Sequence, residues 1–175
     1  MIQILLLGFP ALLSFQAYEG DGLGPHKVGW EDIQFIDQNF NRHQVKGRIF
    51  YPATQAGEFG PPATSAGPFP LAGFAHGWTE PVADYLPLLK HLASWGFVVT
   101  FVSTELGLWG EMKAEAQDLQ PLMHWTNDQS ANPQHWLFQL VADGSWGALG
   151  HSMGGVAWHF FPSPETAPLA LEFSN

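Results

Sequence analysis

Residues 71–102 read LAGFAHGWTEPVADYLPLLKHLASWGFVVTFV, and this stretch decides the fold class. The short apolar run at 71–75 predicts a strand. Residues 97–102 form a continuous β-branched and aromatic run, as expected for a strand buried on both faces. Between them, four apolar residues share one helical stripe that ends before Gly96: Leu86, Leu89, Leu92 and Ala93. A strand, a helix and a second strand in this order predict a crossover and a parallel sheet.

The sequence before this unit predicts an antiparallel hairpin. The segments VGWEDIQF at 28–35 and QVKGRIFY at 44–51 alternate imperfectly with a period of two residues, and polar turn residues separate them. The next segment, 52–70, is dense in proline and glycine, which neither a helix nor a sheet tolerates in such numbers. We therefore expect a surface loop there.

The second half of the chain continues the alternation of helices and strands. We expect a helix over 111–123 that is interrupted near Pro121, followed by a polar loop over 126–133. The runs SWGALG at 145–150 and PLALEF at 168–173 predict two more strands. The whole pattern predicts an α/β fold with a mostly parallel sheet led by an antiparallel hairpin.

Composition excludes several classes of function. The 175 residues include 46% hydrophobic residues, which is too apolar for a disordered chain. Six basic and sixteen acidic residues give a net charge of −10, so nucleic acid would be repelled. The chain has no cysteine, which excludes disulfides, thiolate zinc sites and cysteine nucleophiles.

The first seventeen residues, MIQILLLGFPALLSFQA, predict a signal peptide and a secreted or periplasmic protein. Their apolar run is too short to span a bilayer as a helix, which takes roughly 20 residues. Against a signal peptide, the run is not preceded by a basic residue, and Phe15 is a poor residue near the cleavage site. A buried N-terminal element or a wrongly assigned start are the alternatives. We expect residues 18–175 to belong to one domain.

The motif GHSMGG at 150–155 predicts a nucleophile elbow, in which Ser152 occupies a sharp turn between a strand and a helix. A glycine-rich turn without chemistry is the alternative. The segment His76-Gly77-Trp78 follows an upstream strand, where such enzymes place half of the oxyanion hole. The backbone N–H groups of Trp78 and Met153 are therefore the candidate oxyanion donors. Aromatic residues suggest an apolar cleft beside them: Trp78, Trp109 and Phe74.

These two motifs give the chain a resemblance to a known family. FAHGWTEPVADYLPLLKHLASWGFVV together with GALGHSMGGVA is similar to the α/β-hydrolase branch that holds chlorophyllases, platelet-activating-factor acetylhydrolases and bacterial cutinase-like polyester hydrolases. The resemblance extends from about residue 24 to 173. It implies an α/β-hydrolase fold and a cofactor-free serine carboxylic ester hydrolase that forms an acyl-enzyme. Ser152 would be the nucleophile, and the substrate an apolar small-molecule, lipid or polymer ester.

The same resemblance implies a catalytic acid and histidine that follow the last predicted strand. We identify no base or acid in these residues, so we expect the N-terminal portion of a hydrolase domain whose C-terminal strands are missing. The other candidates suit surface, interface or turn positions better: His124, His135, His159, Asp118, Asp128, Asp143 and His151. A catalytically dead binding protein on the same fold is the alternative. A metal-dependent amidase or lyase ranks last, because no histidine pair has the spacing of metal ligands.

Overall fold

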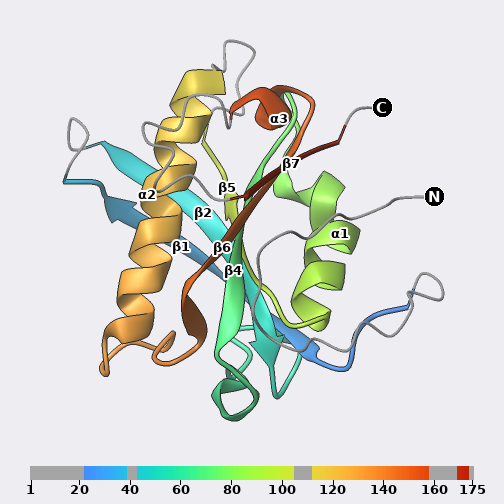
Figure 1. Ribbon diagram of the computed structural model, residues 1–175, viewed down its shortest axis with the longest axis vertical. Coiled ribbons are helices and arrows are strands. Elements are labelled where there is room, and N and C mark those ends of the chain that lie inside the picture. The colour runs from blue at the N-terminus through green and yellow to red at the C-terminus, as the bar shows by residue number, and fades with distance from the viewer. Residues whose placement is uncertain (1–21, 39–42, 105–111, 158–168, 174–175) are drawn as a thin grey trace.

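The computed structural model describes residues 22–38, 43–104, 112–157 and 169–173. The predicted signal peptide, Trp109 and His159 lie outside these residues. Seven strands form one sheet in the order β3-β1-β2-β5-β4-β6-β7 (Figure 1). The strands are β1 (Lys27–Ile36), β2 (Gln44–Ala53), β3 (Gly57–Glu58), β4 (Phe69–Ala75), β5 (Val98–Val102), β6 (Val141–His151) and β7 (Leu169–Phe173). The helices are α1 (Val82–Ser94), α2 (Met112–Ala131) and α3 (Met153–Ala157), with a 3-10 turn η1 at Thr64–Ala66.

Strand directions confirm the predicted α/β class. β1 and β2 pair antiparallel as a hairpin, and β2 pairs antiparallel with β5. From β5 through β4 and β6 to β7 every neighbouring pair is parallel. The carboxyl ends of β4 and β6 consequently lie at the same edge of the sheet, with Ala75 paired to Gly150.

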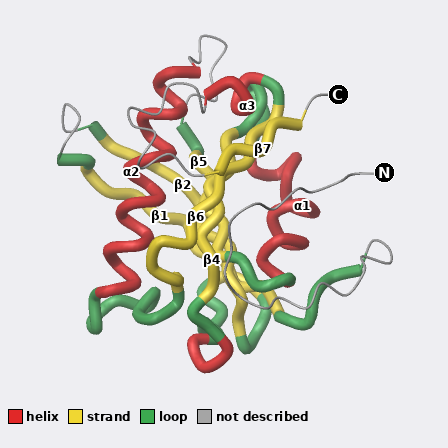
Figure 2. Tube along the Cα trace, viewed as in Figure 1, coloured by secondary structure: helices red, strands yellow, loops and turns green. Residues whose placement is uncertain are grey.

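Helices cover both faces of the sheet. Figures 1 and 2 show α1 on one face and α2 on the other. In β5 the two buried faces alternate along the strand, since Val98 and Val102 pack in the core beneath α2, and Val99 and Phe101 in the core beneath α1. α1 contributes its predicted apolar stripe, of which Leu89 is fully buried. No helix in the described part of the chain is long and apolar enough to cross a membrane.

The prediction for the segment between 111 and 133 was wrong. α2 continues through Pro121 and includes most of the expected polar loop, ending at Ala131. α2 also contains four buried polar residues, Glu115 and Asp118 before Pro121 and Thr126 and Ser130 in the expected loop. The Thr126 hydroxyl donates to the Leu122 carbonyl at 2.8 Å, and Ser130 Oγ accepts the Val141 N–H at 2.9 Å. Burial of this whole face against the sheet outweighs the cost of an internal proline.

The predicted surface loop over 52–70 is shorter than expected. β2 extends to Ala53 and β4 begins at Phe69, so that both ends of the segment belong to the sheet. The remainder contains the two-residue β3 and the turn η1. Phe74, expected beside a cleft, is fully buried between the sheet and α1, where its ring packs on Tyr85 at a centroid distance of 4.7 Å. It therefore belongs to the core.

Candidate functional site

Ser152 occupies the turn between β6 and α3, as the motif predicted. β6 ends at His151 and α3 begins at Met153, so the serine is the one residue between strand and helix. Its φ is 52°, a left-handed conformation that is uncommon for a residue with a side chain. The serine is exposed at the carboxyl edge of the sheet. A strained, exposed serine between a strand and a helix is what the predicted nucleophile elbow requires.

The two glycines of the motif allow close backbone approaches around this turn. A Cβ atom added to Gly150 would lie 2.4 Å from the carbonyl oxygen of Gly154. One added to Gly154 would lie 2.3 Å from the carbonyl oxygen of Ala75 and 2.6 Å from that of His76. The start of α3 therefore packs directly on the end of β4, with no room for a side chain between them.

The loop after β4 lies beside the Ser152 turn, because Ala75 and Gly150 are paired. It contains Trp78, whose side chain is 55% exposed, and Thr79, which has a φ of 59°. A β-branched residue with positive φ is strained, and strain of this kind gathers at functional sites. Two strained non-glycine residues thus flank the same edge of the sheet, one on each of the two neighbouring segments.

A hydrogen-bonded group of three side chains joins these segments. His151 Nδ1 lies 2.8 Å from Glu80 Oε2 and 2.8 Å from the Tyr85 hydroxyl oxygen. The Tyr85 hydroxyl donates to Glu80 Oε2 and accepts the Gly77 N–H at 2.8 Å. Because a carboxylate only accepts, Nδ1 of His151 is the protonated ring nitrogen. The residue that precedes the serine is therefore bound to the loop by its side chain.

Hydrogen bonds and burial shift the pKa values of Glu80 and Tyr85 in opposite directions. The hydrogen bond from Tyr85, opposed by burial and assisted by His151, lowers the pKa of the Glu80 carboxyl. Burial and the bond to Glu80 raise the pKa of the Tyr85 hydroxyl. At neutral pH Glu80 is therefore a carboxylate acceptor and Tyr85 a protonated donor.

His76 lies beneath the same loop and is fully buried. Its backbone N–H donates to Glu115 Oε1 at 2.5 Å, which ties the end of β4 to α2. Its ring nitrogens each approach a carbonyl oxygen at 2.8 Å, Nδ1 that of Gly77 and Nε2 that of Thr104. Glu115 is fully buried as well. The loop is therefore held by Glu115 of α2 and also by the hydrogen bonds among Glu80, Tyr85 and His151.

The other candidate residues are not brought to Ser152. His124 and His135 contact tryptophan rings, Trp146 at a centroid distance of 4.8 Å and Trp125 at 5.3 Å. Burial lowers the pKa of His135. Asp118 is bound to His43, while Asp128 and Asp143 are exposed. Within the described ranges, Ser152 Oγ has no hydrogen bond to a histidine, and no group of three His, Asp or Glu could hold a metal ion.

Sequence reasoning missed the side chains that support the loop. Glu80, Tyr85 and Glu115 come from the loop, α1 and α2, and Glu115 is 39 residues away from His76 in the chain. Their spacing forms no local pattern, since the sheet topology alone brings them together. One signal was present: Tyr85 is on the helical stripe of α1 and is a residue whose polar end needs a partner when it is buried.

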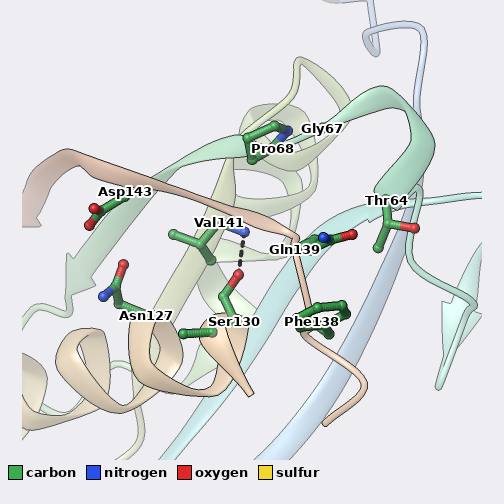
Figure 3. A pocket seen from close by; sticks show the side chains of 10 residues that line it. Thr64, Gly67, Pro68, Asn127, Ser130, Phe138, Gln139, Val141 and Asp143 are labelled. Atoms are coloured by element: carbon green, nitrogen blue, oxygen red, sulfur yellow. Dashed lines mark hydrogen bonds between the residues drawn. The ribbon is translucent and has the colours of Figure 1, made fainter. Parts of the chain in front are cut away.

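A hollow of about 650 Å³ lies at the opposite end of β6 (Figure 3). Val141, the first residue of β6, and Asp143 line it, together with Asn127 and Ser130 from α2. The Ser130 hydroxyl in this hollow is already bound to the Val141 N–H, as the dashed line in Figure 3 marks. Because the whole strand separates it from Ser152, the hollow is not part of the candidate active site.

The chain matches no protein-family model, and no curated protein is similar to it at a significant level. Any assignment of function therefore depends on the local chemistry around Ser152.

Proposed function

We propose that the chain carries the nucleophile and the oxyanion donors of a serine carboxylic ester hydrolase of the α/β-hydrolase family. The observation that carries this proposal is Ser152 itself, an exposed serine with a φ of 52° between a parallel strand and a helix. Strained turns of this type lift a serine hydroxyl clear of the backbone so that it can meet a base and a substrate.

Three further features support the proposal. The loop with His76-Gly77-Trp78 follows β4, the strand paired directly with β6, as an oxyanion loop requires. Gly154 lets the helix after the serine touch the carbonyls of that loop. The parallel strands β5, β4, β6 and β7, preceded by the antiparallel hairpin, agree with the predicted mostly parallel α/β sheet.

In the proposed reaction Ser152 Oγ attacks the ester carbonyl carbon, and its proton passes to a base. The carbonyl electron pair moves onto the oxygen, and the N–H groups of Trp78 and Met153 stabilise that oxyanion. Collapse of the tetrahedral intermediate breaks the bond to the alcohol oxygen, which takes the proton from the base. Water then hydrolyses the acyl-enzyme by the same steps. The substrate is an apolar ester, in keeping with the exposed apolar side chains Trp78 and Val156 on the two segments.

None of the described histidines is hydrogen-bonded to Ser152 Oγ, and His151 is bound instead to Glu80 and Tyr85. The proposal therefore includes a histidine and an acid outside the described residues. With no base hydrogen-bonded to Ser152 among the described residues we expect little ester turnover, because triad members act as a unit. The same observation favours one alternative, a catalytically dead binding protein that keeps the fold.

A fluorophosphonate probe tests the proposal, because Ser152 Oγ would form a bond to phosphorus while the P–F bond breaks and HF is released. We expect slow labelling, found on Ser152 by mass spectrometry and absent in Ser152→Ala. Labelling of Ser152 no faster than that of other exposed serines would favour the binding protein. A chromogenic short-chain ester gives the second readout. Robust turnover that Ser152→Ala abolishes would overturn the expectation of little turnover.

A further inference from the structure

Three backbone polar groups of the loop after β4 are hydrogen-bonded: the N–H of His76, the N–H of Gly77 and the carbonyl of Gly77. The His76 N–H donates to Glu115, and the Gly77 N–H donates to the Tyr85 hydroxyl. The Gly77 carbonyl accepts two bonds, one from His76 Nδ1 at 2.8 Å and one from the Glu80 N–H at 3.1 Å. These hydrogen bonds restrict rotation of the peptide planes in this segment.

The orientation of the Gly77 carbonyl determines the orientation of the Trp78 N–H. The two groups belong to one trans peptide unit and point to opposite sides of the chain. Any contact that holds the carbonyl toward the protein interior therefore holds the N–H away from it. His76 Nδ1 makes such a contact, and it does so from a fully buried side chain.

The ring of His76 faces two acceptors. The carbonyls of Gly77 and Thr104 lie at 2.8 Å from Nδ1 and Nε2, and a carbonyl oxygen can only accept. A neutral imidazole has one N–H and would satisfy one of them. The imidazolium form has two and satisfies both. Its charge then needs a buried counterion, and Glu115 Oε1 lies 3.6 Å from Nε2.

The charged groups around His76 agree with a cation at this position. Glu115 of α2 approaches it from one side, and Glu80 of the loop is close enough to interact electrostatically with it. Phe101 of β5 also lies beside His76, with a ring centroid 5.7 Å away, and the Tyr85 hydroxyl of α1 accepts the N–H of the next residue, Gly77. The acidic side chains near His76 are thus Glu115 and Glu80.

We propose that Glu115 holds His76 as a buried imidazolium, and that this pair is a positioning device for the Trp78 N–H. The role of that N–H as an oxyanion donor rests on the proposed function. The ion pair itself does not, so the two can be tested separately.

The ion pair is tested by ¹⁵N NMR of the histidine-labelled chain at pH 8, where a free histidine is mostly neutral. We expect both ring nitrogens of His76 to carry protons, with the signal assigned through its loss in His76→Gln. In Glu115→Gln one nitrogen should lose its proton. A single N–H on the His76 ring of the unsubstituted chain would overturn the proposal, and this measurement requires no catalytic activity.

The positioning role is tested by the rate at which the fluorophosphonate labels Ser152. Loss of one oxyanion donor costs about 10²–10³ in rate. Glu115→Gln keeps the Trp78 N–H but holds it less firmly in position, so we expect labelling to slow about 10-fold or more. Asp118→Asn is the matched control, because it removes another buried carboxylate of α2 that binds His43 and not the loop. Equal labelling rates in the two folded variants would overturn the positioning role. If Ser152 in the unsubstituted chain is not labelled, the proposed function and the positioning role fail, while the NMR result still decides the ion pair.

Discussion

His151 Nδ1 lies 2.8 Å from Glu80 Oε2, so the residue that precedes Ser152 is joined to the loop that follows the neighbouring strand. Parallel pairing brings the two segments to one edge of the sheet, but pairing ends at Ala75 and Gly150. Beyond that point the side chains of His151, Glu80 and Tyr85 maintain the contact. The candidate site is therefore held by polar contacts in a region where the backbone ladder has already ended.

The Glu80 carboxylate should stabilise the fold in a pH-dependent manner. Its pKa is lowered in the folded state, so its stabilisation is complete above the unfolded value of about 4.5 and is lost as pH falls through the folded value. We expect Glu80→Gln to lower the melting temperature at pH 7, with the difference from the unsubstituted chain narrowing below about pH 4.

Tyr85→Phe provides the control for this effect, because it removes the hydroxyl that contributes most to lowering the Glu80 pKa. The double variant should be less destabilised than the sum of the two single variants, since both remove one shared contact. A melting-temperature difference for Glu80→Gln that stays constant from pH 7 to pH 3 would contradict the prediction.

Gly154 should not tolerate a side chain. An added Cβ would lie 2.3 Å from the Ala75 carbonyl oxygen, so Gly154→Ala must push α3 away from β4. We expect a loss of about 1–3 kcal/mol in the free energy of unfolding, measured by urea denaturation. Gly147→Ala in β6 is the matched control, because an added Cβ there meets nothing within 4 Å. Its expected change is within about 0.5 kcal/mol. Equal losses in both variants would show that the close approach is not the cause.

The fold was predictable from the sequence in the segments whose apolar residues followed one clear pattern, either a continuous buried run or a helical stripe. The buried run at 97–102 and the apolar stripe of α1 gave the strand-helix-strand unit correctly, because burial on the sheet requires those patterns. α2 was misjudged because Pro121 is a poor helix residue and because Thr126 and Ser130 are polar yet buried. The Thr126 hydroxyl donates to the Leu122 carbonyl within the helix, while Ser130 Oγ accepts the N–H of Val141 in β6, a partner that a local pattern does not reveal.

The candidate site was predictable in part. Ser152 and Trp78 were predicted as site residues because the glycine spacing around the serine and the position of the loop after a strand are local features. Glu80, Tyr85 and Glu115 were not found, because their role depends on which helix covers which face of the sheet. Sequence motifs identified the groups proposed to act on a substrate, and the structure added the groups that hold them.

The backbone strain at Ser152 should be measurable as a difference in the free energy of unfolding between two variants of this residue. Its φ of 52° is unfavourable for any residue with a Cβ, by about 1–2 kcal/mol, and costs glycine nothing. We expect Ser152→Gly to be more stable to urea than Ser152→Ala by about 1 kcal/mol, after the entropic cost of glycine. Both variants lack the hydroxyl, so that the comparison isolates the backbone. A Ser152→Ala variant as stable as Ser152→Gly would indicate that the turn is relaxed.

A base supplied from solution should accelerate chemistry at Ser152 if the proposed nucleophile and oxyanion donors are competent without their histidine. Imidazole can accept the serine proton during attack on phosphorus, and general bases contribute about 10²–10⁴ in rate when positioned. We expect fluorophosphonate labelling of Ser152 to rise with imidazole concentration and with the fraction of imidazole that is neutral as pH increases. Other exposed serines, quantified in the same mass spectra, should show a much smaller rise. Labelling that is fast without imidazole and insensitive to it would instead mean that a base is already present beside Ser152.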